Sequence, residues 1–225
     1  KGNVVLPDLI ADELAAEAGI STDIAVDAIR YFLCREVPFG LDGDFSMTAL
    51  KGRFDSDLAN DLGNLLNRTL SMIGRYFDGV IPDPKDKAGG LRDVVADTVD
   101  AAGKAAEKLE FSRALDLIWQ MIGAANKFIN DRKPWELERQ GRKDELAGVL
   151  YSAAEVARAA AIMISPFMPS TAVEIARQLG IADGFELLKW NNANDEKPIK
   201  PGTRIQGPEP IFPRLGAKKK EEPAK

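Results

Sequence analysis

The feature that most limits the possible folds is a stripe of apolar residues that begins at Leu50 and ends at Phe77. Its members recur at steps of four and then three along the chain: Leu50, Phe54, Leu58, Leu62, Leu66, Leu70, Ile73 and Phe77. That spacing puts all of them on one face of a helix of about eight turns. Residues 47–77 are therefore predicted to form one long amphipathic helix, with Ser46 as its N-cap.

Shorter stretches of helical periodicity flank this segment on both sides. They predict helices at residues 7–18, 23–37 with Asp23 as N-cap, 91–108, 110–131, 134–140 with Asp131 near its cap, 145–164, and from Pro169 to Gly180. Aromatic residues make up only 7% of the chain, while Ala and Leu are plentiful, which favours a helical core over a β-sandwich. The predicted fold is all-α, an up-and-down helical bundle of about five helices.

Changes in composition divide the chain into four parts. Residues 1–45 are predicted to form a small helical module, and residues 46–180 the bundle. Residues 181–215 contain five prolines and little helical periodicity, so they are expected to return across the bundle as an extended strap. Residues 216–225 are charged and lack core residues, which predicts a disordered tail.

The chain contains no histidine and only one cysteine, Cys34. Catalysis by Ser-His-Asp or Cys-His groups is therefore excluded, as are metal sites built on histidine. One cysteine cannot form an internal disulfide, and it cannot hold zinc without further nitrogen or sulfur ligands. No glycine-rich phosphate loop is present. We expect no catalytic residue, no bound metal and no cofactor in this chain.

The overall charge and hydropathy limit the possible partners. The formal net charge is −5, so any nucleic-acid partner must be bound by a local patch rather than by the whole surface. No uninterrupted apolar run approaches the ~20 residues that span a bilayer, so we expect no membrane contact.

A polar stripe on the predicted long helix is the first candidate site. It contains Asn64 and Arg68, which are four residues apart and hence about 6 Å apart on one face. One interpretation is an ordinary solvated helix face. The other is recognition, because an amide beside a guanidinium offers donors and an acceptor in the geometry that suits the edges of unpaired bases.

Trp135 is the second candidate, since this bulky apolar residue follows Pro134 within the charged stretch "NDRKPWELER". Pro134 is expected at the first position of a short helix. Trp135 would then cover one end of the bundle as a lid, or it would present an aromatic surface on which an unpaired base stacks.

Several phrases of the sequence occur together in one known family. They are "KGNVVLPDLI", "EVPFGLDGDFS", "SDLANDLGNLLNR", "FINDRKPWEL", "ISPFMPSTAVEIARQLG" and "GPEPIFPRL", in this order. With them the chain resembles the C-terminal part of the methionyl-tRNA synthetases, which are class I aminoacyl-tRNA synthetases. The resemblance covers nearly all of residues 1–215.

The resemblance implies a function that the residue patterns alone do not. In that family an Asn and an Arg on the first bundle helix, together with the Trp after a Pro, read the CAU anticodon, and these positions fall on Asn64, Arg68 and Trp135. The implied partners are tRNA(Met), both initiator and elongator, and the enzyme's own N-terminal catalytic domain, but no DNA. Residues 1–45 would correspond to the stem-contact module, and the location would be the cytoplasm.

The same resemblance implies that catalysis takes place elsewhere. The full enzyme forms methionyl-tRNA from methionine, tRNA and ATP, the last with magnesium. Its catalytic domain carries a His-Ile-Gly-His-type motif and a Lys-Met-Ser-Lys-Ser loop, and neither occurs here. This chain alone is therefore expected to lack the ATP and methionine sites and to be inactive.

Two alternatives of other kinds remain at this point. A helical bundle of this type could bind a protein instead of RNA, in which case an apolar groove between helices is expected. The chain could also be the anticodon-binding domain of a related class I synthetase for Leu, Ile, Val or Cys. The phrases "PW" and "NLLNR" argue against this second alternative.

Overall fold

The computed structural model describes residues 6–37, 40, 45–85, 91–181, 189–194 and 198–216, with only the backbone for residues 6 and 7. The helices, in chain order, are α1 (Leu6–Ala18), α2 (Thr22–Glu36), α3 (Met47–Arg53), η1 (Phe54–Gly63), α4 (Asn64–Tyr76), α5 (Leu91–Glu107), α6 (Phe111–Arg132), α7 (Pro134–Arg139), α8 (Lys143–Ile164), α9 (Pro169–Gln178) and η2 (Trp190–Ala193). Within the described ranges the only β-type pairing is an isolated antiparallel bridge between Val80 and Arg204. The predicted all-α class is confirmed.

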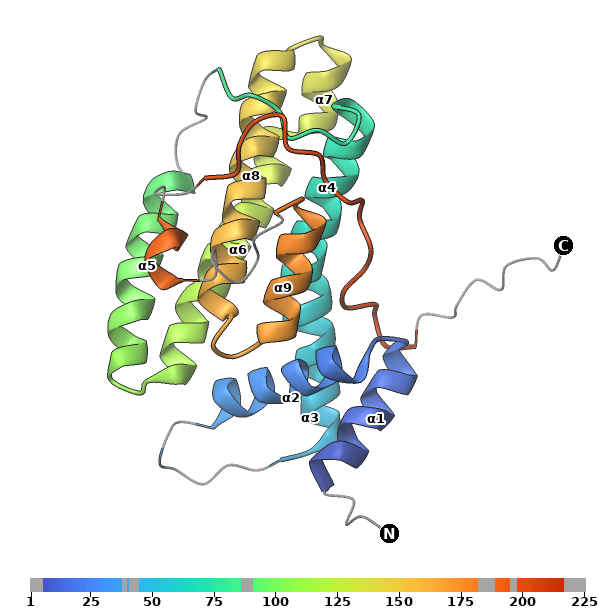
Figure 1. Ribbon diagram of the computed structural model, residues 1–225, viewed down its shortest axis with the longest axis vertical. Coiled ribbons are helices and arrows are strands. Elements are labelled where there is room, and N and C mark those ends of the chain that lie inside the picture. The colour runs from blue at the N-terminus through green and yellow to red at the C-terminus, as the bar shows by residue number, and fades with distance from the viewer. Residues whose placement is uncertain are drawn as a thin grey trace, which may run out of the picture.

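The long helices run alternately up and down along one axis (Figure 1). The rod formed by α3, η1 and α4 rises, α5 descends, α6 rises, α8 descends and α9 rises again. The short helix α7 lies at one end of this bundle, whereas α1 and α2 lie at the other end. The up-and-down bundle predicted from the apolar periodicity is therefore confirmed.

The predicted long helix at 47–77 exists as one continuous rod, but its middle is not α-helical. Phe54–Gly63 is a π-helix, in which each amide bonds to the carbonyl five residues earlier. Five successive steps of four residues separate Leu50 from Leu70. At 3.6 residues per turn each such step rotates the stripe by about 40°, or about 200° in total. The wider π-helical turns reduce this rotation, so that Leu50, Phe54, Leu58, Leu62, Leu66 and Leu70 all remain buried.

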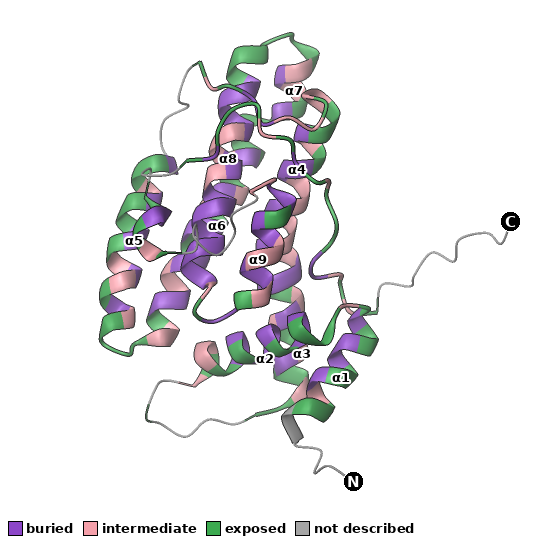
Figure 2. Ribbon diagram, viewed as in Figure 1, coloured by how far each residue is buried: buried purple, intermediate pink, exposed green. Residues whose placement is uncertain are grey.

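Helix α8 is the centre of the core. Most of its length is buried, as the colouring in Figure 2 shows. Within the described residues it is the one helix that is long and apolar enough to cross a membrane by length and composition, but 83% of the relevant window is buried inside the protein. A helix that is apolar on all sides is typical of a bundle centre.

Helix α2 is bonded to the bundle and so links the N-terminal part of the chain to it. Its N-cap is Ser21, whose Oγ accepts from the Ile24 amide, so the prediction of Asp23 as N-cap was wrong by two residues. At the far side the buried carboxylate of Asp27 accepts from the Thr171 amide at 2.7 Å, in the first turn of α9. Thr171 thus has a partner that its own helix cannot supply. The boundary between a module and the bundle at residue 45 stays a prediction.

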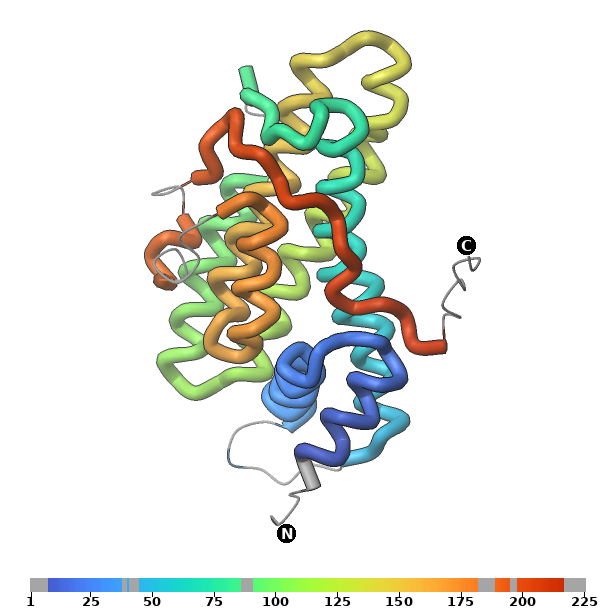
Figure 3. The backbone as a smooth tube through the Cα atoms, turned by 45° about the vertical axis from the view of Figure 1, so that its right-hand side comes forward, coloured from blue at the N-terminus to red at the C-terminus, as the bar shows by residue number. Residues whose placement is uncertain are grey.

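The chain after residue 197 returns as an extended segment across the bundle, drawn in red in Figure 3. We call residues 198–216 the strap. At one end the Ile81 amide donates to the Thr203 carbonyl at 2.8 Å, and at the other the Leu215 amide donates to Asp55 Oδ1 at 2.9 Å. Ile211 and Phe212 are buried between these points. Residues 217–225, nearly all of the predicted disordered tail, lie outside the described residues.

A buried arginine holds the segment that precedes the strap. Arg158 on α8 is 1% exposed, and its guanidinium donates to the carbonyls of Asn192 at 2.6 Å and Ala193 at 3.2 Å in η2. It also forms a 3.0 Å ion pair with Glu155, whose other oxygen accepts from the Ile199 amide at 2.7 Å. The pair therefore satisfies backbone groups of η2 and of the strap together.

Candidate functional site

The two polar residues singled out on the long helix lie against α6. Asn64 Nδ2 donates to Asn126 Oδ1 at 3.2 Å, and Arg68 Nη2 donates to Asn130 Oδ1 at 2.9 Å. Both pairs are 62 residues apart in the sequence, so α4 and α6 run parallel in a fixed register. The four side chains form two rungs between the helices, and we call them the amide ladder.

A hydrogen bond from Asn126 to the π-helical segment η1 sets the orientation of the Asn126 amide in the ladder. Asn126 Nδ2 donates to the backbone carbonyl of Asp61 at 3.0 Å, which directs Asn126 Oδ1 toward Asn64. Asn64 therefore uses its NH₂ group within the protein. Within the described part of the chain no group donates to Asn64 Oδ1, so this acceptor and the remaining donors of Arg68 are available to a ligand.

Asn126 and Asn130 were not identified from the sequence. Their spacing of four residues matches that of Asn64 and Arg68, and this repeated polar spacing was the only available signal. Periodicity alone does not show which face of α6 meets α4. The partnership therefore becomes visible only once the register between the two helices is known.

Trp135 is placed by a sharp turn after α6. Lys133 adopts the left-handed conformation, with φ 46° and ψ 63°, and Pro134 begins α7 directly afterwards. Pro134 and Leu137 are buried, whereas Trp135 between them is 40% exposed. Asp131, predicted near the cap of this helix, lies two residues before the N-cap Lys133, and no side chain caps the first turn.

The amide ladder and Trp135 lie at the same end of the bundle. Asn130, which accepts from Arg68, is two residues before the end of α6, and α7 with Trp135 follows at once. Figure 1 shows α7 at the end of the bundle that the α4 rod also reaches. The end therefore combines an exposed aromatic ring with hydrogen-bonding groups in fixed positions.

The charge at this end is locally positive, although the whole chain carries −5. Arg68 donates to Asn130 and Lys127 is exposed, while Arg132 lies over the ring of Phe128 with its Cζ 5.3 Å from the ring centre. Lys133 pairs with Glu136 at 3.5 Å. A basic patch of this kind is the local patch that an acidic chain needs in order to bind nucleic acid.

A second polar cluster connects the π-helical segment to α2. The buried Asp57 carboxylate accepts from Tyr31 Oη at 2.6 Å and from Arg53 Nη1 at 3.2 Å. Burial raises the pKa of Tyr31, and the Asp57 charge raises it further. Burial, and then the charge of Asp57, also raises the pKa of Asp61, the residue whose carbonyl orients Asn126.

The described residues contain no group of three or more Cys, Asp or Glu side chains that could hold a metal ion. Asp42 and Asp44, the two carboxylates of the segment "LDGDFS", lie outside the described residues.

Two family models match the chain and together cover most of it. Residues 14–70 match the model described as "tRNA synthetases class I (M)", and residues 83–225 match the "Anticodon binding domain of methionyl tRNA ligase". With the helical bundle and the polar site at its end, these matches place the chain among the class I aminoacyl-tRNA synthetases.

Individual relatives make the assignment narrower. The chain is 44% identical to the methionine–tRNA ligase of Caldanaerobacter subterraneus subsp. tengcongensis, in an alignment of 223 residues that covers 97% of this chain. It is 42% identical to the methionine–tRNA ligase of Bacillus subtilis, in an alignment that covers 96% of this chain. The chain belongs to the methionyl-tRNA ligase family. The alternatives of a protein-binding bundle and of a synthetase for Leu, Ile, Val or Cys are set aside accordingly.

Solved structures agree with the fold. The structure of Mycobacterium tuberculosis methionyl-tRNA synthetase in complex with methionyl-adenylate superposes with a TM-score of 0.80 and 34% identity, over 95% of this chain and 40% of that chain. The chain spans about a third of the length of the curated relatives it matches. It contains the anticodon-binding domain of these ligases but not their catalytic domain.

Proposed function

We propose that Asn64, Arg68 and Trp135 bind the CAU anticodon of the initiator and elongator methionine tRNAs. The single observation that carries this proposal is the amide ladder beside an exposed tryptophan. Asn64 Oδ1 and the free guanidinium donors of Arg68 present an acceptor and donors to base edges, and the indole of Trp135 presents a surface on which an unstacked base lies.

We further propose that the whole ligase to which this chain belongs joins methionine to tRNA in the cytoplasm with ATP and magnesium. The chain alone then binds tRNA without charging it. The expected partner within the same enzyme is the catalytic domain. In support, Leu9 on α1, Val26 and Leu33 on α2, and Phe45 just before α3 are between 40% and 54% exposed, so these apolar side chains are accessible to another domain.

Replacing Trp135 by alanine should weaken binding of methionine tRNA about fivefold to a hundredfold, because stacking of one base contributes ~1–3 kcal/mol. Affinity is measured by filter binding with the full chain and both methionine tRNAs. The matched control is Trp135→Phe, which keeps an aromatic face and should lose much less. If Trp135→Ala binds as tightly as the wild type, the site assignment is wrong.

Replacing Arg68 by glutamine should reduce discrimination rather than affinity alone. A guanidinium that contacts base edges contributes ~1–3 kcal/mol to the preference for the correct base. We expect the ratio of affinities for CAU and for a hairpin with one anticodon base changed to fall about tenfold. Arg75→Gln, two turns further along α4, should leave the ratio unchanged. Equal losses for both hairpins would identify Arg68 as a phosphate contact instead.

A further inference from the structure

The amide ladder is built directly on the end of the π-helical segment η1. The Asp61 carbonyl accepts from the backbone amide of Asn64, and it also accepts from Asn126 Nδ2 at 3.0 Å. Asn126 Oδ1 in turn accepts from Asn64 Nδ2 at 3.2 Å. Asn64 is the first residue of α4, so its position and that of Arg68, one turn later, depend on the last turn of η1.

The wide turns of η1 determine which side of α4 faces α6. Within η1 the side chains of Phe54, Leu58 and Leu62 follow one another at steps of four residues, and all three are buried. In an α-helix each step of four residues rotates the side chain by about 40°, so α-helical turns over these two steps would rotate α4 by about 80° relative to α3. Such a rotation would carry Asn64 and Arg68 away from α6.

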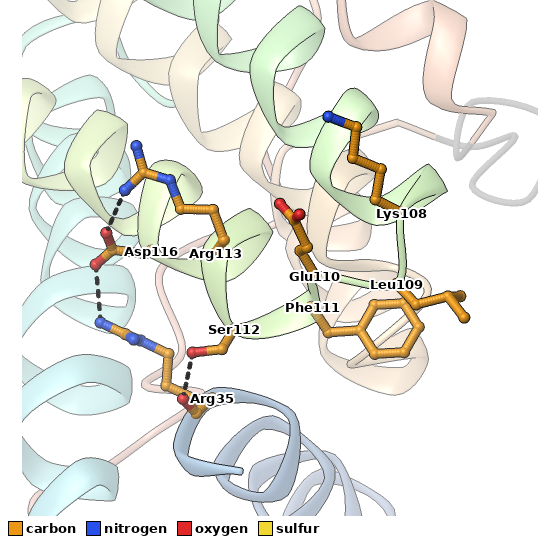
Figure 4. Close-up of a pocket in the computed structure, with 8 residues that line it drawn as sticks. All are labelled: Arg35, Lys108, Leu109, Glu110, Phe111, Ser112, Arg113 and Asp116. Carbon is orange, nitrogen blue, oxygen red and sulfur yellow. Dashed lines mark hydrogen bonds and ion pairs between the residues drawn. The ribbon is translucent and has the colours of Figure 1, made fainter. Parts of the chain in front are cut away.

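Helix α6 is held in place independently of α4, through hydrogen bonds to α2. Arg35 Nη2 donates to Asp116 Oδ1 at 2.9 Å, and Ser112 Oγ donates to the Arg35 carbonyl at 2.7 Å. Figure 4 shows both bonds beside a cavity of about 580 Å³, together with Arg113, which donates to the other oxygen of Asp116. Because α6 is fixed in this way, the match between α4 and α6 depends on the turns of η1.

Hydrogen bonds from three neighbouring elements fix individual residues of η1. From α6, Trp119 Nε1 donates to the Asp57 carbonyl at 3.2 Å. From α2, Tyr31 Oη donates to the Asp57 carboxylate at 2.6 Å. From the strap, the Leu215 amide donates to Asp55 Oδ1 at 2.9 Å. A change to α-helical turns would move these acceptors, so the three bonds favour the π-helical form.

Gly63, the last residue of η1, has no room for a side chain. A Cβ there would lie 2.9 Å from the carbonyl oxygen of Leu58. Leu58 is five residues earlier, which is the separation of a π-helical hydrogen bond. The obstacle is therefore the backbone of η1 itself, and Phe212 Cβ of the strap lies 3.8 Å from the same point. A side chain at position 63 requires a change in the last turn of η1.

We propose that Gly63 is a positioning residue for the anticodon site, because it permits the π-helical turn that holds Asn64 and Arg68 against α6. This inference rests on the proposed function. Gly63 does not touch the bases, and it acts through the direction in which α4 presents the two polar side chains. That direction matters because base edges are read by hydrogen bonds of fixed geometry, and a small displacement of the groups that make them reduces discrimination.

The test is Gly63→Ala in the full chain, with Gly52→Ala in α3 and Gly74→Ala in α4 as matched controls. Two RNA hairpins serve as probes, one with the CAU anticodon and one with a single anticodon base changed. Gly63→Ala should lower the ratio of the two affinities on the order of tenfold, through weaker binding of CAU. A Cβ at either control glycine meets nothing within 4 Å, so both controls should keep the wild-type ratio, and alanine should make their helices more stable.

Tyr31→Phe is a second variant that leaves the backbone of η1 unchanged in sequence. It removes the hydroxyl group that donates to Asp57, on a helix outside the anticodon site. We expect the ratio of affinities to fall about threefold. The matched control is Tyr151→Phe, which removes a hydroxyl group that donates to the Ile199 carbonyl at 3.0 Å and should leave the ratio unchanged.

The outcomes separate the positioning role from the proposed function. If the wild type shows no preference for the CAU hairpin, the anticodon function itself fails. If the wild type prefers CAU and folded Gly63→Ala keeps the full ratio, or loses affinity equally for both hairpins, only the positioning role of Gly63 is overturned. Far-UV circular dichroism checks the fold of each variant. Should Gly63→Ala not fold, an unchanged ratio in Tyr31→Phe overturns the proposal, and a lowered ratio supports it.

Discussion

Replacing Arg158 by leucine is expected to lower the free energy of unfolding by about 3–5 kcal/mol. The substitution leaves Glu155 as a largely buried charge and removes both donors from the carbonyls of Asn192 and Ala193. In a protein of this size that loss corresponds to a fall in melting temperature of roughly 6–20 °C. Urea unfolding followed by far-UV circular dichroism measures it.

The matched control for this variant lies on α9. Arg177 pairs with Glu174 at the same spacing of three residues and at 2.6 Å, but its side chain is 44% exposed. Arg177→Leu should therefore cost only about 0–1 kcal/mol. The combined change Glu155→Gln with Arg158→Met removes both charges and should recover part of the loss. If Arg158→Leu and Arg177→Leu proved equally mild, the buried pair would not hold η2 and the strap.

Gly180→Ala is the second substitution with a large expected effect. Gly180 has φ +77°, and a Cβ there would lie 2.2 Å from the carbonyl oxygen of Arg204 in the strap. The left-handed backbone costs alanine about 1–2 kcal/mol, and overpacking adds about 1–3 kcal/mol. We expect a total loss of about 2–5 kcal/mol, with faster hydrogen exchange of the Ile81 amide, which donates to Thr203.

Gly141 separates the two contributions to this loss. It has a similar φ of +69°, but a Cβ there meets nothing within 4 Å. Gly141→Ala should therefore show only the backbone cost, and the difference between the variants measures the contact between α9 and the strap. Equal losses at the two glycines would mean that the strap moves aside freely.

The helices were predictable because their signals are local. The stripe from Leu50 to Phe77 and the prolines and glycines that bound α9 need no information from distant residues. The π-helical segment was not predicted. The signal for it was present, because the apolar stripe repeats every four residues five times in succession, whereas an α-helical turn contains only 3.6 residues. That run is a local signal, and it can be recognised in other sequences.

The site was predictable only in part, because half of it depends on distant pairing. The spacing of Asn64 and Arg68 and the Pro134–Trp135 step were visible in the sequence. Asn126 and Asn130, which fix the first two, lie 62 residues further along the chain. From the sequence Arg158 would be expected at the surface. It can be buried because carbonyls of η2, more than 30 residues further along the chain, accept hydrogen bonds from its guanidinium.

The strap has a mechanical consequence for the rod that carries Asn64. The strap is hydrogen-bonded to the chain at two points. One is Ile81, which follows the C-terminal end of α4, and the other is Asp55, in the first turn of η1. A wide turn advances less per residue than an α-helical turn, so relaxation of η1 to an α-helix would lengthen the rod between these two anchors. The strap opposes such lengthening, because it is hydrogen-bonded at both anchors. Tyr31 bonds to Asp57 and Asn126 to the Asp61 carbonyl, both inside η1, so the strap also opposes a change in the spacing of these two contacts.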